Sequence, residues 1–262
     1  MGYAKKSLGQ HFLHSKDILN VIRDAADVVG NDLVLEIGPG RGDLTKILLI
    51  SVGKVIAVEK DDELYSELKE KFKNEIESGK LDLIHGDILE FDPNLLEFYK
   101  DLNYKIVANI PYNITGSILR KFLSAFYQPK SMTLLVQKEV AERIVAKDGK
   151  ESILSISIKA YGVPKYIKTV KAGSFNPPPK VDSAIIQIDE ISKDFFTDFD
   201  EKGFFDMVRA GFKSKRKKLS SNLSEIYGKD RVMSAFDTLK LDQNTRAEDV
   251  NIKIWQNLAK VV

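Results

Sequence analysis

The sequence contains no cysteine and only three histidines among its 262 residues. The absence of cysteine excludes a disulfide framework, a thiolate zinc site and a cysteine nucleophile. A catalytic metal would have to rest mainly on carboxylates, and the sequence holds no acidic cluster with ligand spacing. We therefore expect no metal cofactor.

Long apolar runs are also missing from the chain. No stretch approaches the roughly 18 apolar residues that a membrane span requires. Residues 1–6 lead into no apolar segment of the kind that opens a secretory signal. These absences predict a soluble, cytoplasmic protein that has no membrane partner.

A large charge of one sign is the third feature that the chain lacks. Its 40 basic residues are balanced by 38 acidic ones, so the formal net charge is only +2. A protein that binds nucleic acid through bulk charge alone is thereby excluded, and any site for a polyanion must be a local patch. The apolar content of 43% and the charged content of 30% are those of an ordinary folded globule.

Short apolar runs alternate with amphipathic segments over the first 190 residues. This alternation predicts an α/β domain of the Rossmann-like type, in which helices cover both faces of a mostly parallel sheet. The seven expected strands are residues 32–38, 54–59, 81–85, 104–109, 131–137, 165–170 and 181–188. The expected helices are residues 16–29, 44–50, 64–72, 115–125, 138–147 and 152–161. A proline-rich loop joins the last two strands, which predicts an antiparallel hairpin that closes the sheet.

The composition changes near residue 190. Residues 191–208 carry five acids and five phenylalanines, whereas residues 209–218 carry six basic residues and no acid. Beyond them, apolar residues recur at helical spacing and no strand candidate follows. We therefore predict two domains, an α/β sheet domain at 1–190 and a small all-helical domain at 191–262.

A glycine-rich turn follows the first expected strand of the sheet. Gly38, Gly40 and Gly42 alternate at the entry to a helix, where the backbone can approach a ligand closely. Glu59 ends the next strand, where an acid can accept hydrogen bonds from both hydroxyls of a ribose. The dinucleotide fingerprint G-x-G-x-x-G fits imperfectly, because the third glycine comes one residue early. S-adenosylmethionine is therefore the expected cofactor, and an NAD-dependent oxidoreductase is a distant alternative.

The end of the third strand supports a bound adenosine. Asp87 follows His85 and Gly86, and its carboxylate can accept a hydrogen bond from the exocyclic amine of adenine. Ile88 would then lie against the ring. Each of these strand ends alone could be an ordinary turn, but their order at three successive strands indicates a nucleoside cofactor.

The fourth strand ends in Asn109-Ile110-Pro111-Tyr112. One interpretation is a turn that caps the following helix. The other is a catalytic one, because the amine of a nucleobase is a poor nucleophile whose lone pair is delocalised into the ring. The Asn109 side-chain oxygen and the Ile110 backbone carbonyl could accept its two N–H bonds, while Tyr112 stacks on the base. Asn109 cannot ionise, so it would position and polarise the amine, and no general base is required.

Six segments, taken in chain order, resemble one protein family. They are Leu8–Leu13, Glu36–Gly40, Asn109–Tyr112, Leu135–Ala141, Phe175–Ser183 and Arg246–Asp249. The resemblance is to the ribosomal RNA adenine N6-dimethyltransferases, specifically the type that acts on small-subunit RNA (KsgA type). It implies transfer of two methyl groups to each of two adjacent adenosines in the 3′-terminal hairpin of small-subunit (16S) rRNA, with S-adenosylmethionine as donor, during ribosome biogenesis.

The resemblance also implies roles for single residues. Those that contact the donor are His11, Leu13, Gly38, Glu59, Asp87, Ile88 and Asn109, and those at the reaction centre are Asn109, Ile110, Tyr112 and Phe175. Phe175 resembles a second aromatic face that clamps the target adenine opposite Tyr112. Two plainer interpretations stay open, namely a solvated His11 and a Phe175 that merely anchors a stiff loop in the core.

The basic run is the expected RNA-binding surface. Its members are Arg209, Lys213, Lys215, Arg216, Lys217 and Lys218, to which the resemblance adds Lys5 and Lys6. A charge run is often only a solvated face. Six positive charges without an acid stand out in a nearly neutral chain, however, and they would position RNA through its phosphates rather than read its sequence.

The expected partner is therefore small-subunit rRNA in a pre-ribosomal particle, bound by a monomer. Two rival functions remain. The erythromycin-resistance methyltransferases share the donor motifs and Asn-Ile-Pro-Tyr but modify large-subunit (23S) RNA, and residues 177–183 and 216–222 are closer to the small-subunit type. A non-catalytic assembly factor that kept the fold is the other rival, and the intact Asn-Ile-Pro-Tyr argues against it.

Overall fold

A computed structural model of the chain describes residues 10–99 and 103–262. The chain forms two compact units. The first consists of the residues up to Ala141 together with Lys165–Ile191, and the second of Glu142–Pro164 together with Ser192–Val262. Residues 142–164 thus belong to the same unit as the C-terminal helices. The division into domains 1–190 and 191–262 stays a prediction.

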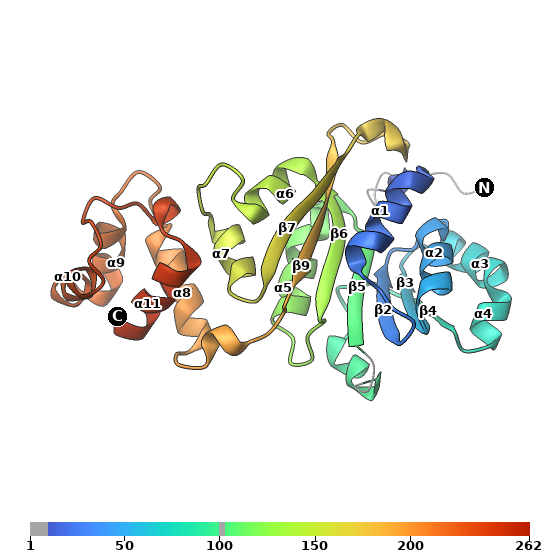
Figure 1. Cartoon of the computed structure of the whole chain (residues 1–262), viewed down its shortest axis with the longest axis horizontal. Helices are drawn as coiled ribbons and strands as arrows, with labels where there is room; N and C mark the ends of the chain where they lie inside the picture. The colour runs from blue at the N-terminus through green and yellow to red at the C-terminus, as the bar shows by residue number, and fades with distance from the viewer. Residues whose placement is uncertain (1–9, 100–102) are drawn as a thin grey trace. The chain divides into compact units, whose positions relative to one another are not determined.

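The first unit is built on a seven-stranded sheet, as the sequence predicts (Figure 1). The strands follow the order β4-β3-β2-β5-β6-β9-β7. Their bounds are β2 Asp32–Ile37, β3 Lys54–Glu59, β4 Leu81–His85, β5 Asn103–Asn109, β6 Ser131–Gln137, β7 Val163–Val170 and β9 Ser183–Asp189. Strands β2 to β6 run parallel to one another, and β9 is antiparallel to β6. The last two strands are neighbours as expected, but the later one, β9, inserts between β6 and β7.

Helices cover both faces of this sheet. Their bounds are α1 Lys16–Ala26, α2 Asp43–Ser51, α3 Asp62–Lys71, α4 Lys73–Glu77, α5 Thr115–Leu123 and α6 Lys138–Val145. Figure 1 shows α1 and α2 on one face and α5 on the other. Helix α1 ends three residues earlier than the sequence predicts, because Asp27 adopts a left-handed conformation with φ of 45°. Val29, expected on its buried face, is exposed as a result.

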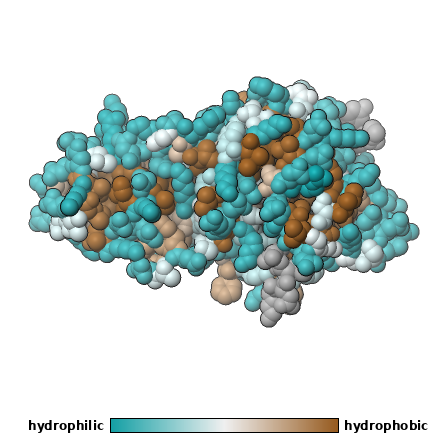
Figure 2. All heavy atoms as spheres, viewed as in Figure 1, coloured by the Kyte–Doolittle hydropathy of each residue, from teal (hydrophilic) through white to brown (hydrophobic). Residues whose placement is uncertain are grey.

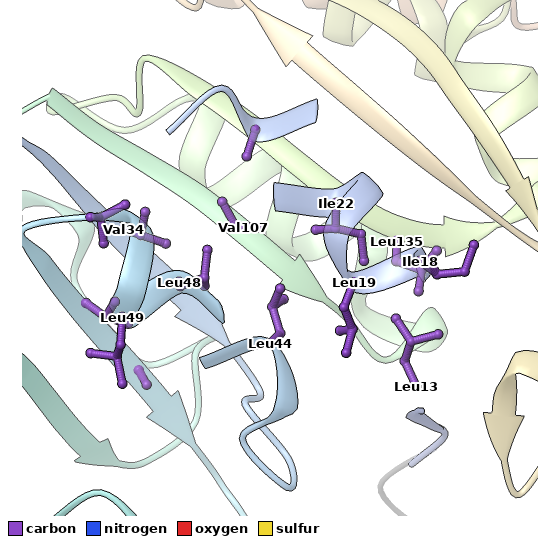
Figure 3. Close-up of a cluster of buried hydrophobic side chains, with 14 of the residues drawn as sticks. Leu13, Ile18, Leu19, Ile22, Val34, Leu44, Leu48, Leu49, Val107 and Leu135 are labelled. Carbon is purple, nitrogen blue, oxygen red and sulfur yellow. The ribbon is translucent and has the colours of Figure 1, made fainter. Parts of the chain in front are cut away.

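The main core lies between the sheet and the helices α1 and α2. Ile18, Leu19 and Ile22 of α1 pack over Val107 of β5 and Leu135 of β6 (Figure 3). Every residue of β2 is buried, as is typical of a strand that is covered on both faces. Because β2, β3, β4 and β5 are parallel, their carboxyl ends lie at one edge of the sheet, which is where ligands bind in folds of this kind.

A second, two-stranded sheet was not predicted from the sequence. Strand β1 (Phe12–Leu13) pairs antiparallel with β8 (Phe175–Asn176). The backbone N–H of His14 also donates to the carbonyl of Ser174, at 3.1 Å. These bonds join the N-terminal segment to the proline-rich loop, although the two are more than 160 residues apart in the chain.

The second unit is helical, as predicted for the C-terminal tail. Its helices are α7 Ile153–Lys159, α8 Glu201–Gly211, α9 Leu219–Tyr227, α10 Lys229–Thr238 and α11 Ile252–Val261. They enclose a core around Trp255 and Phe236, both fully buried. The acidic, phenylalanine-rich stretch before α8 packs its rings around Phe204 in mostly edge-to-face pairs, so it is part of this core.

On the face seen in Figure 2, hydrophobic side chains are interrupted by hydrophilic ones. Within residues 10–99 and 103–262, no helix has the length and apolar character that crossing a membrane requires.

Gly211 generates a stability prediction for the helical unit. A Cβ at this position would lie 2.4 Å from the Trp255 ring and 2.7 Å from Leu219, closer than real contacts allow. We expect Gly211→Ala to destabilise the protein by about 1–3 kcal/mol through overpacking. Gly116→Ala in α5 is the matched control, since nothing lies within 4 Å of its Cβ position. Urea unfolding of both variants checks this, and equal midpoints for the two would contradict it.

Candidate active site

A cavity of about 270 Å³ opens at the edge where the carboxyl ends of β2, β3, β4 and β5 meet. Nine of the predicted site residues line it. They are His11, Leu13, Gly38, Glu59, Asp87, Ile88, Asn109, Ile110 and Tyr112. The parallel sheet therefore brings together four strand ends that are far apart in the sequence.

The glycine turn after β2 forms one wall of the cavity. Gly38 and Gly40 have φ values of +64° and +59°, which residues with a Cβ rarely adopt. At Gly38 nothing lies within 4 Å of the position that a Cβ would take, so this backbone is open to a ligand. Its N–H donates to the carbonyl of Val58 at 3.0 Å, which ties the turn to the end of β3.

Glu59, at the end of β3, is almost completely buried beside this turn. One of its carboxylate oxygens accepts from the N–H of Gly40 at 3.0 Å, and the other accepts from the N–H of Asp61 at 2.9 Å. Burial raises the pKa of Glu59, and these backbone bonds act in the opposite direction. Each carboxylate oxygen has a second lone pair, so the side chain can still accept from two ribose hydroxyls.

Asp87, after β4, lies at the opening of the cavity. Its carboxylate forms an ion pair with Lys60 at 2.7 Å and accepts from the N–H of Leu89 at 2.8 Å. Lys60 lowers the pKa of Asp87, so the group is an ionised acceptor at neutral pH. The sequence analysis did not single out Lys60, because nothing in its local context distinguishes it from other lysines. Ile88 is 5% exposed and presents an apolar surface next to this acceptor.

Asn109 ends β5, and its side chain has a defined orientation. The amide Nδ2 donates to the backbone carbonyl of His11 at 3.1 Å. A carbonyl can only accept, so the amide nitrogen must face His11 and the Oδ1 atom is the acceptor left for another group. Ile110, the next residue, is 2% exposed.

Tyr112 is held by its hydroxyl, which lies 2.6 Å from the hydroxyl of the buried Ser183. Burial raises the pKa of Tyr112, so the phenol stays protonated at neutral pH. The rings of Tyr112 and His11 are nearly parallel, with an interplanar angle of 19° and centroids 6.0 Å apart. His11 is therefore held against the site and is not a freely solvated side chain.

Residues 10–14 form an N-terminal strap over this edge of the sheet. The Gln10 amide donates to the Asp61 carboxylate at 3.1 Å, and His11 Nδ1 lies 2.8 Å from the carbonyl of Pro177. The guanidinium of Arg41 lies 4.5 Å from the centroid of the Phe12 ring, which is a cation–π contact. The strap thus contacts the glycine turn, β5 and the proline-rich loop.

Phe175 does not line the cavity with the other predicted residues. It is 2% exposed, packs in the main core and borders a neighbouring hollow together with Phe12 and Arg41. This placement corresponds to the plainer interpretation, an aromatic residue that anchors the loop. A stacking role for Phe175 stays a prediction.

Glu36 is a cavity residue that the sequence analysis missed as a site residue. Its side chain is 1% exposed, and its Oε2 atom has no hydrogen-bond partner among the described residues. Burial raises the pKa of Glu36 to about 8. Its position in the strand before the glycine turn was the available signal, but nothing in the sequence reveals that one of its carboxyl oxygens lacks a partner.

The basic run is less positive in the structure than in the sequence. Arg209 pairs with Asp206, and Lys213 and Lys217 both pair with Glu225. Acids from outside the run thus pair with three of its six positive charges, and an RNA-binding role for the run stays a prediction. Three exposed cations, Lys215, Arg216 and Lys218, have no ion-pair partner in the part of the chain that the structure describes. Lys5 and Lys6 lie outside the described residues.

The cavity has the features that S-adenosylmethionine requires. An open glycine backbone, a strand-end acid and an apolar wall beside an ionised acceptor correspond to its methionine, ribose and adenine parts. The unpartnered oxygen of Glu36 adds an acceptor for a cationic ligand. Within residues 10–99 and 103–262, no three or more His, Asp or Glu side chains are placed to hold a metal ion.

Comparison with protein families gives a match over the whole chain. The family described as "Ribosomal RNA adenine dimethylase" matches residues 1–262. A ribosomal RNA small subunit methyltransferase A from Dehalococcoides mccartyi is 44% identical over 97% of this chain and 87% of that protein. A protein of the same name from Fusobacterium nucleatum is 39% identical over 98% of this chain and 97% of that protein.

Solved structures with the same fold cover both units. A dimethyladenosine transferase from Plasmodium falciparum is 28% identical, with a TM-score of 0.76 over 95% of this chain and 96% of that one. The 23S rRNA methyltransferase ErmE has a TM-score of 0.78 over 95% of this chain and 99% of that one. Its identity is 24%, so this similarity bears on the fold alone.

The raised pKa of Glu36 generates a pH prediction. Folded Glu36 keeps its proton up to about pH 8, whereas the unfolded group loses it near its ordinary value of 4.5. The folded state therefore binds more protons between these values, and stability falls as the pH rises through them. Glu36→Gln removes this pH-dependent contribution to stability. From pH 5 to pH 9, we therefore expect the free energy of unfolding of the variant to rise relative to that of wild type by on the order of a few kcal/mol. Urea unfolding at the two pH values checks this, and a constant difference between the proteins would contradict it.

Proposed function

The chain belongs to the ribosomal RNA adenine dimethylase family, and from this premise we propose that it dimethylates N6 of two adjacent adenosines in the 3′-terminal hairpin of small-subunit (16S) rRNA during ribosome biogenesis. It is an rRNA adenine dimethyltransferase. One observation supports the site of reaction more than any other. Asn109 lines the same cavity as the glycine turn, and its amide is oriented by the His11 carbonyl.

S-adenosylmethionine, when bound, supplies an electrophilic methyl group on a sulfonium. We assign its methionine part to Gly38 with His11 and Leu13, its ribose to Glu59, and its adenine to Asp87 and Ile88. Glu36, which holds a proton at neutral pH without a ligand, offers its unpartnered oxygen as a hydrogen-bond partner for the methionine part. These assignments rest on the shared cavity and on the ionised or hydrogen-bonded state of each acceptor.

The target amine is activated by the way in which its two hydrogen-bond acceptors hold it. Asn109 Oδ1 and the Ile110 carbonyl accept the two N–H bonds, which holds the amine's lone pair out of conjugation with the ring and toward the donor. Tyr112 stacks on the base, and its hydroxyl bond to Ser183 restricts the ring. The proton leaves after methyl transfer, so no residue of the cavity has to act as a base. Phe175 would supply a second aromatic face only after β8 releases its ring from the core.

The adenosine must leave its stack to reach Tyr112, as is general for enzymes that modify bases. We assign backbone contacts with the RNA to the basic run, including Arg209, Lys213 and Lys217, and to Lys5 and Lys6. Lys215, Arg216 and Lys218 are its uncompensated members. Such contacts orient the hairpin without reading its sequence. A cytoplasmic monomer acting on a pre-ribosomal particle is the form that we propose.

Asn109→Ala tests the reaction centre. We expect the variant to fold and to bind S-adenosylmethionine as wild type does, because the other donor contacts are intact. Methyl transfer should fall by at least about 100-fold, since one of two oriented acceptors is lost. Asn74→Ala on the exposed surface of α4 is the control and should keep full activity. The measurements are single-turnover transfer to rRNA and calorimetric donor binding, and near wild-type transfer by Asn109→Ala would refute the mechanism.

A subunit-resolved assay tests the substrate. Tritiated methyl donor is offered with small-subunit particles or with large-subunit RNA, each from cells that lack the modification. We expect label only in the small-subunit sample, at two adjacent adenosines. Label in large-subunit RNA would favour the erythromycin-resistance type of activity. Donor binding without transfer to either sample would favour a non-catalytic assembly factor.

A further inference from the structure

Glu225 on α9 contacts the basic loop, which we define as residues 212–218. Its two carboxylate oxygens are each taken by a different lysine, with Lys213 Nζ at 2.9 Å from Oε2 and Lys217 Nζ at 2.9 Å from Oε1. All three side chains are substantially exposed. One acid therefore compensates two of the five cations of the loop.

The backbone of the basic loop is fixed in a way that holds these lysines toward α9. Asn222 is 1% exposed, and its amide donates to the carbonyls of Gly211 at 2.6 Å and Ser214 at 3.1 Å. The N–H of Lys217 also donates to the Ser214 carbonyl at 3.0 Å. The pairing of Lys213 and Lys217 with Glu225 is thus a property of an ordered turn.

These ion pairs are of the kind that a phosphate can replace. Exposed lysine–carboxylate pairs contribute little stability, because water screens them and the long side chains lose freedom in them. A phosphate oxygen accepts the same ammonium hydrogen bonds as a carboxylate oxygen. The two lysines hold the pKa of Glu225 down at about 2, so the competing charge is present at any physiological pH.

We propose that Glu225 is an intramolecular competitor for RNA phosphate, which occupies Lys213 and Lys217 and so limits binding that is driven by phosphates alone. This inference rests on the proposed RNA-binding role of the basic loop. Lys215, Arg216 and Lys218 remain available to any RNA, whereas Lys213 and Lys217 are available only where a phosphate displaces the carboxylate. The arrangement matters most for unrelated RNA, because such RNA is held by little other than its phosphates and has no contacts with target bases to offset the competition.

Glu225→Gln keeps the shape of the side chain and removes its charge. We expect the variant to bind an unrelated RNA hairpin on the order of tenfold more tightly than wild type at moderate salt, because two cations are freed. The slope of log affinity against log salt should steepen by about 1–2 for the same reason. The target hairpin should gain by about the same factor, because its phosphates face the same two lysines, but its contacts with the target bases hold it in wild type without that gain.

The controls separate the effect of a changed net charge from the effect of releasing Lys213 and Lys217. Glu77→Gln changes the net charge equally but breaks an exposed pair with Lys73 in α4, and we expect no change in RNA affinity from it. In a Lys213→Gln, Lys217→Gln background, the effect of Glu225→Gln should vanish. Fluorescence anisotropy with labelled hairpins over a salt series measures all of these.

A failure of the competitor role can be distinguished from a failure of the proposed RNA-binding surface. If replacing Lys215, Arg216 and Lys218 by Gln weakens RNA binding but Glu225→Gln leaves affinity and salt slope unchanged, the competitor role is wrong and the basic loop still binds RNA. If that triple replacement leaves binding unchanged, the proposed RNA surface is wrong and the inference falls with it. A persistent Glu225→Gln effect in the Lys213→Gln, Lys217→Gln background would also overturn the inference.

Discussion

The parallel pairing of β2 with β3 and β5 is the constraint on which the rest of the structure depends. It sets Ile37 beside Val58 in neighbouring strands, so that the glycine turn begins where Glu59 ends its own strand. The same sheet also places Asp87 and Asn109 at this edge, although they follow Gly38 by about 50 and 70 residues in the chain. The donor-site residues and Asn109 come from four strand ends, so the sheet and not the local sequence brings them together. The site exists because buried apolar strands align in one register, and a slip of one residue would reverse the direction of every side chain.

The N-terminal strap, residues 10–14, orients a side chain of the proposed reaction centre at this edge of the sheet. Its His11 carbonyl sets the direction of the Asn109 amide, and the strap itself is held by pairing with β8 and by the contact of Arg41 with Phe12. An asparagine without such a partner could rotate its amide and present N–H groups to an amine that needs acceptors. In the proposed mechanism, the two-stranded sheet therefore has a chemical consequence, because it supports the orientation of the acceptor that would hold the target amine.

Much of this could be predicted from the sequence, where the signal is local. Strands β3 and β6 have the bounds that their apolar runs indicate, and the glycine turn and Asn109–Tyr112 lie at strand ends as expected. The rest depends on contacts between distant segments. Two-residue strands such as β1 carry no periodicity, and burial decides whether Phe175 packs in the core or faces a ligand. Asp206 lies just outside the basic run and pairs with Arg209 within α8, whereas Glu225 reaches Lys213 and Lys217 only because α9 packs beside the loop. Likewise, the protonation state of Glu36 follows from a cavity that no local pattern describes.

The central claim is that this cavity methylates two adjacent adenosines of small-subunit rRNA. The most direct test maps N6-methylated adenosines on rRNA from cells that lack the gene, before and after the purified protein and S-adenosylmethionine are added to their small-subunit particles. The account predicts two neighbouring adenosines near the 3′ end that change from unmodified to N6-dimethylated, with no change elsewhere. Adenosines that stay unmodified, or that gain methyl groups at another position, would contradict it.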